Sequence, residues 1–225
     1  MKSNKKIFLI IFFLCLFSSV HAADEDNRLW QTIIGEGKFN DNTAWYLELQ
    51  GRIKDDIENF DQGFFRPALN FKITDQSKFW IGYAYIDTKA TDLHSYEDRW
   101  WQQFQYDSSY KDLAWLSRTR IEQRHLSTED QTAYRLRQQM RVSLPINRIN
   151  NLHLLFWDEV FWNMNDTQWA GDNGFNQNRL FTGLMFKYND ASRFEIGYLN
   201  QYINGTNGSS NQINHVLSSN IVFGF

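Results

Sequence analysis

The end of the chain carries the most restrictive pattern in the sequence. Leu217, Ile221, Phe223 and Phe225 lie at one set of alternate positions that continues to the last residue. Side chains two residues apart share one face of a strand, so the pattern predicts a strand with an apolar face that reaches Phe225. The ends of soluble domains are usually frayed and polar. A closed membrane barrel, in contrast, pairs its last strand with its first, because an unpaired strand edge would be costly in lipid.

The start of the chain predicts secretion. Lys2, Lys5 and Lys6 precede an almost unbroken apolar run over residues 7–20, and Ala22 supplies a small residue for cleavage. This order is typical of a signal peptide over residues 1–22, and the run is shorter than the roughly 20 residues of a spanning helix. Cleavage also removes Cys15, which is the only cysteine. Disulfides and thiolate chemistry are therefore excluded from the mature chain.

Composition narrows the class of protein further. The formal charge is −3, and loss of the three leader lysines makes it −6, which argues against nucleic acid as a partner. Aromatic residues make up 17% of the chain, prolines number two, and no long apolar stretch follows the leader. A membrane barrel has this composition, because polar residues facing the lumen alternate with apolar residues facing lipid.

Alternation with a period of two recurs along the whole mature chain. In the clearest case, Tyr134 and Leu136 alternate with Arg135 and Arg137. Most segments are close to the roughly 9–11 residues that a tilted strand needs to cross a bilayer. The pattern predicts an all-β fold, a transmembrane antiparallel up-and-down β-barrel, as a single domain over residues 28–225. The segments are 30–39, 44–53, 65–73, 78–87, 100–107, 113–124, 132–144, 152–162, 179–188, 193–203 and 215–225.

The connections and the strand number refine this expectation. Short polar turns alternate with longer polar segments, over 54–62, 88–96, 125–131, 163–178 and 204–214, as in barrels with turns on one side and loops on the other. Eleven segments are an odd number, whereas bacterial single-chain barrels have an even one. We therefore favour twelve strands, with ten as the alternative. Pro67 lacks the N–H that a closed ladder uses, so we expect a bulge there, near the outer rim.

The mature chain resembles a bacterial outer-membrane β-barrel family known only as a domain of unknown function. The resemblance rests on the segment Leu29-Trp30-Gln-Thr, the strand Tyr46-Leu-Glu-Leu-Gln-Gly-Arg52, an arginine-rich central hairpin and the alternating C-terminus. It implies a protein of the outer membrane of Gram-negative bacteria, and it brings no catalytic residues and no cofactor. The C-terminus also resembles the signal by which such barrels are inserted. The implied partners are outer-membrane lipid and, through Phe225, the barrel-insertion machinery.

Charged residues on the predicted inner face form the candidate site. Arginine on the lipid face at the bilayer midplane would cost about 2–4 kcal/mol, so these side chains are expected to line the lumen. One interpretation is a small anion-biased pore, or a lumen that binds acidic small molecules. The other is a charge network that fills the lumen of a closed structural or adhesion barrel, with Glu48, Glu122, Glu159 and Glu195 as partners. The lumen-lining residues are Arg118, Arg120, Glu122, Arg124, Arg135, Arg137, Arg141, Glu159 and Glu195.

A lipid-modifying hydrolase is the third alternative. His125 and Ser127 lie two residues apart, which resembles the His-x-Ser arrangement of barrel lipid A deacylases. Because no acid occupies the expected third position, we predict a polar loop here and assign no catalytic residue. Carboxylates and amides in the segment 163–178 could hold a hard cation. They have no regular ligand spacing, so we predict an ordinary external loop and no metal site.

Overall fold

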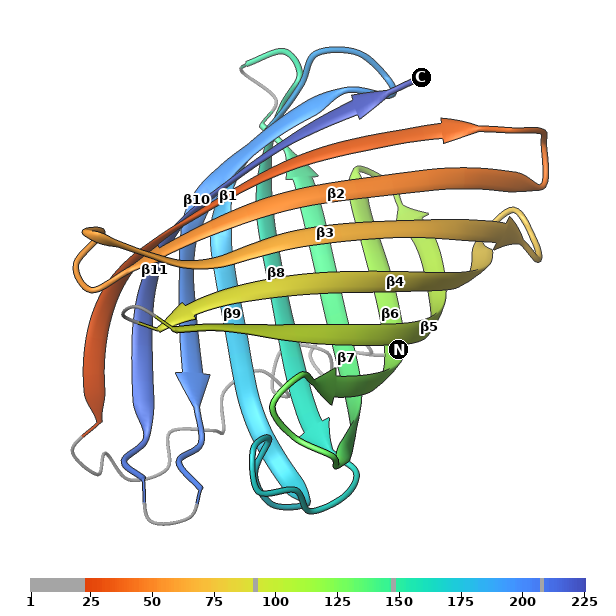
Figure 1. The fold of residues 1–225 in the computed structure, drawn as a ribbon. Helices are drawn as coiled ribbons and strands as arrows, with labels where there is room; N and C mark the ends of the chain where they lie inside the picture. The colour runs from red at the N-terminus through yellow and green to blue at the C-terminus, as the bar shows by residue number, and fades with distance from the viewer. Residues whose placement is uncertain (1–22, 91–92, 147–148, 207–208) are drawn as a thin grey trace, which may run out of the picture.

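Eleven strands form one closed barrel in the computed structural model, which describes residues 23–90, 93–146, 149–206 and 209–225. Each strand pairs with its neighbours in sequence, and the first pairs with the last (Figure 1). The predicted signal peptide, residues 1–22, lies outside the described residues. The strands are β1 (Asp24–Lys38), β2 (Thr43–Lys54), β3 (Asn59–Lys72), β4 (Ser77–Ala90), β5 (Leu93–Tyr110), β6 (Leu113–Leu126), β7 (Thr132–Pro145), β8 (Leu152–Asn163), β9 (Gly174–Lys187), β10 (Arg193–Ile203) and β11 (Gln212–Gly224).

The barrel closes between β1 and β11, which run parallel, whereas all other neighbouring strands run antiparallel. The parallel register runs from Asp24 opposite Gln212 to Glu36 opposite Gly224. At its end, the Phe225 N–H donates to the carbonyl of Glu36 at 2.9 Å, and the Phe225 ring stacks on Trp45. The last strand is thus paired to its end, as the alternating C-terminus predicts.

The fold class expected from the sequence is confirmed, and each of the eleven alternating segments corresponds to one strand, with four segments extending one residue past the end of the strand. The number of strands in the described chain is eleven and differs from the twelve that we favoured. The difference has a physical cause: an odd number of strands closes only if the first and last run parallel, and β1 and β11 do so. Pairing direction leaves no mark in the local alternation, so the sequence could not reveal it.

The two rims of the barrel are named here after the strand ends they contain. At the C-terminal rim, where β11 ends, the connections are short. Asn40 Oδ1 accepts hydrogen bonds from the backbone N–H groups of Asn42 and Thr43 at 2.9 Å. Asn189 Oδ1 likewise accepts hydrogen bonds from the backbone N–H groups of Ala191 and Ser192. Such side-chain bonds fix tight turns. At the N-terminal rim, where β1 begins, the longest connection is the segment 164–173 between β8 and β9.

The strands are longer than the sequence indicated, and β5 has 18 residues. β3 begins at Asn59 and β4 continues to Ala90, inside segments that we had interpreted as loops. Pairing continues there because polar residues beyond the apolar region can still complete a ladder. The expected bulge at Pro67 is wrong. Pro67 lies within β3, where the pairing with β4 is interrupted and resumes in the same register, and the irregularities lie at Arg52/Ile53 and Phe161/Trp162.

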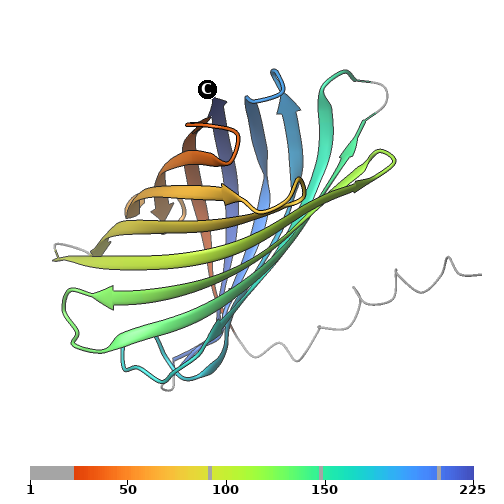
Figure 2. The same cartoon turned by 90° about the vertical axis from the view of Figure 1, so that its right-hand side faces the viewer.

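The two faces of the barrel wall differ sharply. Outward side chains such as Ile33, Phe65, Phe104, Phe156 and Ile221 are exposed, whereas the inward positions hold buried charged, polar and aromatic residues. Figure 2 shows the inclined strands of the barrel wall from a second side. No helix long and apolar enough to cross a membrane occurs in the described part of the chain. The sequence alternation therefore corresponds to an apolar outer surface and a polar lumen.

Candidate functional site

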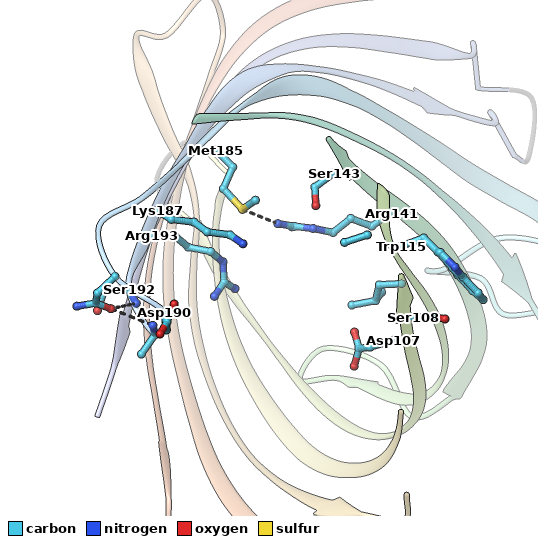
Figure 3. Close-up of a pocket in the computed structure, with 14 residues that line it drawn as sticks. Asp107, Ser108, Trp115, Arg141, Ser143, Met185, Lys187, Asp190, Ser192 and Arg193 are labelled. Atoms are coloured by element: carbon cyan, nitrogen blue, oxygen red, sulfur yellow. Dashed lines mark hydrogen bonds between the residues drawn. The ribbon is translucent and has the colours of Figure 1, made fainter. Parts of the chain in front are cut away.

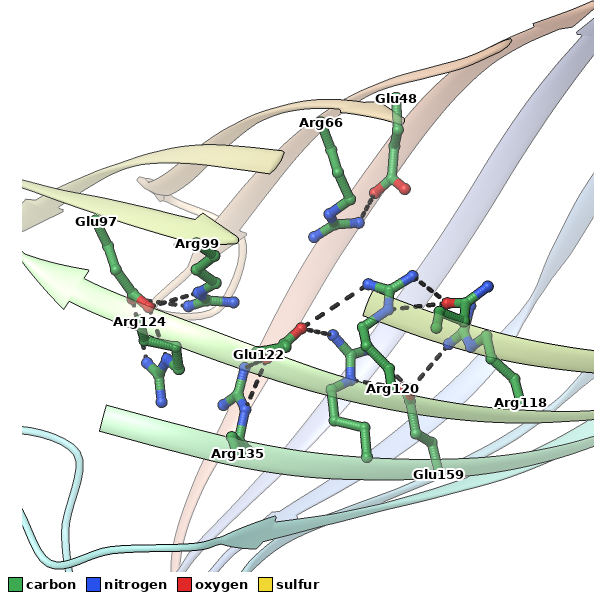
Figure 4. Close-up of polar contacts among 12 residues, drawn as sticks. Glu48, Arg66, Glu97, Arg99, Arg118, Arg120, Glu122, Arg124, Arg135 and Glu159 are labelled. Carbon is green, nitrogen blue, oxygen red and sulfur yellow. Dashed lines mark hydrogen bonds and ion pairs between the residues drawn. The ribbon is translucent and has the colours of Figure 1, made fainter. Parts of the chain in front are cut away.

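The inward faces of β6 and β7 carry most of the residues that the sequence singled out. They alternate along two antiparallel neighbours, so their side chains converge in the lumen (Figure 4). The guanidinium groups in the middle of the set are less than one tenth exposed. The residues are Arg118, Arg120, Glu122 and Arg124 on β6, and Arg135, Arg137 and Arg141 on β7.

Glu122 is the centre of this cluster. It is 2% exposed, and its two carboxylate oxygens accept Arg135 Nη2 and Arg137 Nη1, each at 2.6 Å. Arg120 Nη1 lies 3.8 Å from the same carboxylate. Charge-assisted bonds to guanidinium groups are short and strong. One buried negative charge is therefore shared by three arginines.

Glu159 extends the cluster to β8. It is also 2% exposed, and it accepts Arg137 Nη2 and Arg118 Nη2, each at 2.8 Å. Arg137 thus bridges two glutamates, Glu122 and Glu159. We call the residues Arg118, Arg120, Glu122, Arg135, Arg137 and Glu159 the lumen cluster. The members of the lumen cluster are therefore buried or half-buried and mutually bonded on the inner faces of three adjacent strands, β6, β7 and β8.

Smaller ion-pair groups flank the lumen cluster on both sides. Glu97 binds Arg99 and Arg124, with Arg124 Nε at 2.6 Å. Near the C-terminal rim, Glu195 accepts Arg141 Nη2 at 2.6 Å and Arg193 Nε at 3.0 Å. On the opposite wall, Glu48 pairs with Arg66 and accepts the Tyr46 hydroxyl. All four glutamates that the sequence proposed as arginine partners are thus buried and paired with arginine.

Guanidinium groups and aromatic rings also alternate across the lumen. Arg52 of β2 lies 3.8 Å from the centre of the Trp30 ring, and Arg179 of β9 lies 4.8 Å from the same ring. Arg179 also lies over Phe161, as does Arg137 of the lumen cluster. β1 and β9 are not neighbours in the barrel, so the Arg179–Trp30 contact crosses the interior, whereas the other three contacts join neighbouring strands. Cation–π contacts of this kind stabilise desolvated arginines.

Sequence reasoning missed several members of this interior. Each missed arginine stands alone in its strand, so no arginine spacing within the strand marks it. Arg99 lies beside Arg124 of the neighbouring strand β6, whereas Arg179 reaches Trp30 of β1 only in the closed barrel. The signal that could have found them is their position in the alternation, because they occupy the polar face of their strands. The missed residues are Arg52, Arg66, Glu97, Arg99, Arg179 and Arg193.

Both ends of the lumen have distinct contents. At the N-terminal rim, the 164–173 connection folds over the opening: Trp169 donates to the Gln131 carbonyl at 2.9 Å, and Arg124 lies over the Trp169 ring. At the C-terminal rim, a cavity of about 300 Å³ is lined by Arg141, Lys187 and Arg193, together with acidic side chains (Figure 3). The 164–173 connection thus contacts the lumen residue Arg124 at one rim, and the other rim holds a cavity lined by charged side chains.

The residues of the hydrolase alternative are not brought together. His125 is exposed on β6, and the Ser127 hydroxyl accepts the Tyr96 N–H at 3.1 Å. No hydrogen bond joins His125 to Ser127 in the described residues. Within the same residues, no group of three His, Cys, Asp or Glu side chains is placed to hold a metal ion. The 164–173 connection instead uses its polar groups internally, with Asp166 Oδ1 accepting the Asn173 N–H.

Comparison with known proteins assigns the chain to a family. The family model described as "Protein of unknown function (DUF2490)" matches residues 27–214. The chain belongs to this family. An uncharacterized protein of Methylorubrum extorquens is 33% identical over 220 residues, which cover 95% of this chain and 96% of that protein. Among solved structures, the chain is similar to the NanC porin, with a TM-score of 0.47 and 15% identity over 81% of this chain and 93% of the porin.

Proposed function

We propose that this member of the DUF2490 family is an outer-membrane β-barrel whose lumen attracts and holds acidic small molecules. The outer surface supports the membrane location. Its exposed apolar side chains extend around the barrel, for example Leu49, Ile81, Ile121, Leu184 and Ile196. Soluble monomers rarely expose contiguous apolar patches of more than a few hundred Å², whereas a closed barrel with this pattern satisfies all its backbone groups in lipid.

The main observation in favour of an acidic ligand is the excess of hydrogen-bond donors over acceptors in the lumen. Arginines share the available glutamates, and no carboxylate oxygen of the described residues lies within 4 Å of Arg52 or Arg179. Buried donors without an acceptor are Nε1 of Trp30, Trp80 and Trp101 and Nε of Arg118, against one buried acceptor without a donor, Asn163 Oδ1, and one atom, His153 Nδ1, that donates or accepts according to the tautomer. Buried polar groups normally find partners. A molecule that supplies negative charge and acceptor oxygens complements this interior.

A closed structural barrel is the second candidate, and the lumen cluster favours it. Glu122 and Glu159 are fully enclosed by arginines, so the interior has internal compensation without any ligand. The two candidates differ in what a small anion does. It enters and alters the properties of a lumen that binds acidic molecules, whereas it has no effect on a lumen that only fills space.

Planar-bilayer recording of refolded protein tests the proposal. Under a KCl gradient, an anion-biased pore gives discrete conductance steps with a reversal potential that favours chloride. If the lumen cluster keeps the barrel closed, the bilayer is silent and the proposal then requires saturable binding of acidic molecules to the folded protein. A silent bilayer without anion binding, with folding confirmed by heat-modifiable gel mobility, would leave the structural barrel.

Arg137→Ala distinguishes the two candidates at a single residue. If anions enter the lumen, we expect the variant to lose anion selectivity or binding while it still folds, because Glu122 and Glu159 each keep another arginine. If the arginines only fill space, heat stability falls and permeability is unchanged. The measurements are reversal potential and the temperature of mobility loss. Lys38→Ala, at the exposed end of β1, is the control and should change neither.

We further propose that Phe225 serves as the recognition residue for the barrel-insertion machinery. Its side chain is 82% exposed although its backbone is bonded to Glu36, so the ring is accessible at the C-terminal rim. Deletion of Phe225 is expected to lower the amount of folded protein in the outer-membrane fraction several-fold. Phe225→Tyr keeps the aromatic ring and should behave as the native chain. Equal amounts in both variants would refute the assignment.

A further inference from the structure

We propose that Arg52, Arg179 and Trp30 form a specific site for the carboxylate of a small organic acid. The inference rests on the proposed function and locates it at one point of the lumen. The three side chains come from β2, β9 and β1. None of them was among the candidate site residues of the sequence, because only the closed barrel brings them together.

Neither of the two guanidinium groups has a carboxylate oxygen of the described residues within 4 Å. Arg52 Nε and Nη1 donate to the amide oxygens of Gln50 and Gln62 at 2.8 and 3.0 Å, which leaves Nη2 without an acceptor among the described residues. Arg179 has Gln177 beside it, and rotation of that amide puts its oxygen 3.0 Å from Arg179 Nη2. These partners are neutral. Buried charges are normally paired with an opposite charge. The acidic group that interacts with Arg52 is Asp61, which is bound to Arg28 and Lys54. The one that interacts most with Arg179 is Glu159, which is bound to Arg137 and Arg118. Neither guanidinium group therefore has a carboxylate bound directly to it.

Trp30 is a second and independent sign of a missing acceptor. Its side chain is 3% exposed, and its indole Nε1 has no hydrogen-bond partner among the described residues. A buried tryptophan N–H usually has one. Arg52 and Arg179 both lie over the Trp30 ring, at 3.8 and 4.8 Å from its centre. The unpaired indole N–H of Trp30 and the guanidinium groups of Arg52 and Arg179 therefore lie next to one another.

The chemistry of the site favours a carboxylate with a short apolar body. A guanidinium group offers a planar fork that a carboxylate matches with two oxygens, and a third donor is available from the indole. Trp30 also packs in an apolar cluster with Leu155, Phe181, Leu199 and Val216. These residues would contact hydrocarbon rather than a sugar or a second charged group. Propionate is the simplest probe with both features.

Calorimetric titration of propionate into refolded full-length protein in detergent tests the site. We expect saturable binding to the native protein, a loss of affinity of at least tenfold in Arg52→Gln and in Arg179→Gln, and a loss of several-fold in Trp30→Phe, which removes the indole donor. Lys38→Gln, at the rim, is the control and should bind as the native protein does. Chloride at matched ionic strength should displace propionate only weakly.

The unfolding temperatures show whether the variants still fold, so that a loss of binding can be assigned to the site. Because each replacement removes a buried charge that has no carboxylate bound directly to it, Arg52→Gln and Arg179→Gln should unfold at the same temperature as the native protein or higher without propionate. Propionate should raise the unfolding temperature of the native protein only. If Arg52→Gln and Arg179→Gln both bind propionate as tightly as the native protein does, the site is wrong, but the proposed function of the lumen still stands. Absence of propionate binding to the native protein would overturn the site, and loss of all anion binding and selectivity would overturn both.

Discussion

Glu122→Gln is expected to lower the free energy of unfolding by about 3–5 kcal/mol, the range found when one partner of a buried ion pair is removed. The glutamine keeps the volume of the side chain but not its charge. Arg135, Arg137 and Arg120, which all lie within 4 Å of the Glu122 carboxylate, would then share the remaining negative charge of Glu159. The measurement is denaturant unfolding of the refolded protein, followed by gel mobility or circular dichroism.

Two further variants test the explanation as well as the size of this effect. Glu58→Gln removes an exposed carboxylate in the turn between β2 and β3 and should change stability by less than about 0.5 kcal/mol. Adding Arg135→Met to Glu122→Gln removes one uncompensated charge with little change in volume, so part of the lost stability should return. A Glu122→Gln variant as stable as the native protein would contradict the central role of this carboxylate.

Gly82→Ala is expected to destabilise the barrel by about 1–3 kcal/mol, the usual cost of an added methyl group in a packed interior. A Cβ atom at Gly82 would lie 2.1 Å from the Trp101 ring. That ring is 1% exposed, and it supports the guanidinium of Arg120 at 3.9 Å. Because Trp101 cannot move without displacing Arg120, the strain should spread into the lumen cluster. Thermal unfolding of the refolded variant measures it.

Gly51→Ala is the matched control, because Gly51 is also in a strand but a Cβ there meets no atom within 4 Å. Glycine within a strand costs roughly 0.5–1 kcal/mol relative to alanine, so this variant should be as stable as the native protein or slightly more stable. Equal losses in both variants would mean that the effect arises from the glycine backbone and not from contact with Trp101.

Much of the fold could be predicted because the barrel imposes a local pattern. Tyr134 and Leu136 face outward while Arg135 and Arg137 face inward, and a period of two is visible in any window of the sequence. The direction of the closing pair is a different kind of property. Nothing in residues 24–38 differs according to whether β11 runs parallel or antiparallel to β1, so the eleven segments visible in the sequence were set aside in favour of the even strand number of other barrels.

The candidate site also contains residues that the sequence could reveal and residues that it could not. Arg118, Arg120 and Arg137 were found because they cluster along one hairpin. Arg179 was not, since it is the only arginine of β9 and becomes part of the interior through contacts with Trp30 and Phe161. Contacts across the lumen depend on the curvature and closure of the whole barrel. They leave no spacing that a reader of one sequence could recognise.

The parallel pairing of β1 with β11 has a consequence for how the protein is inserted. β1 begins at the N-terminal rim, and β11 ends at the C-terminal rim. In the membrane location proposed above, the chain crosses an odd number of times, so its two ends belong to different compartments. Insertion must therefore bring β1 and β11 into the bilayer in the same direction, a requirement that a barrel with an even number of antiparallel strands does not have.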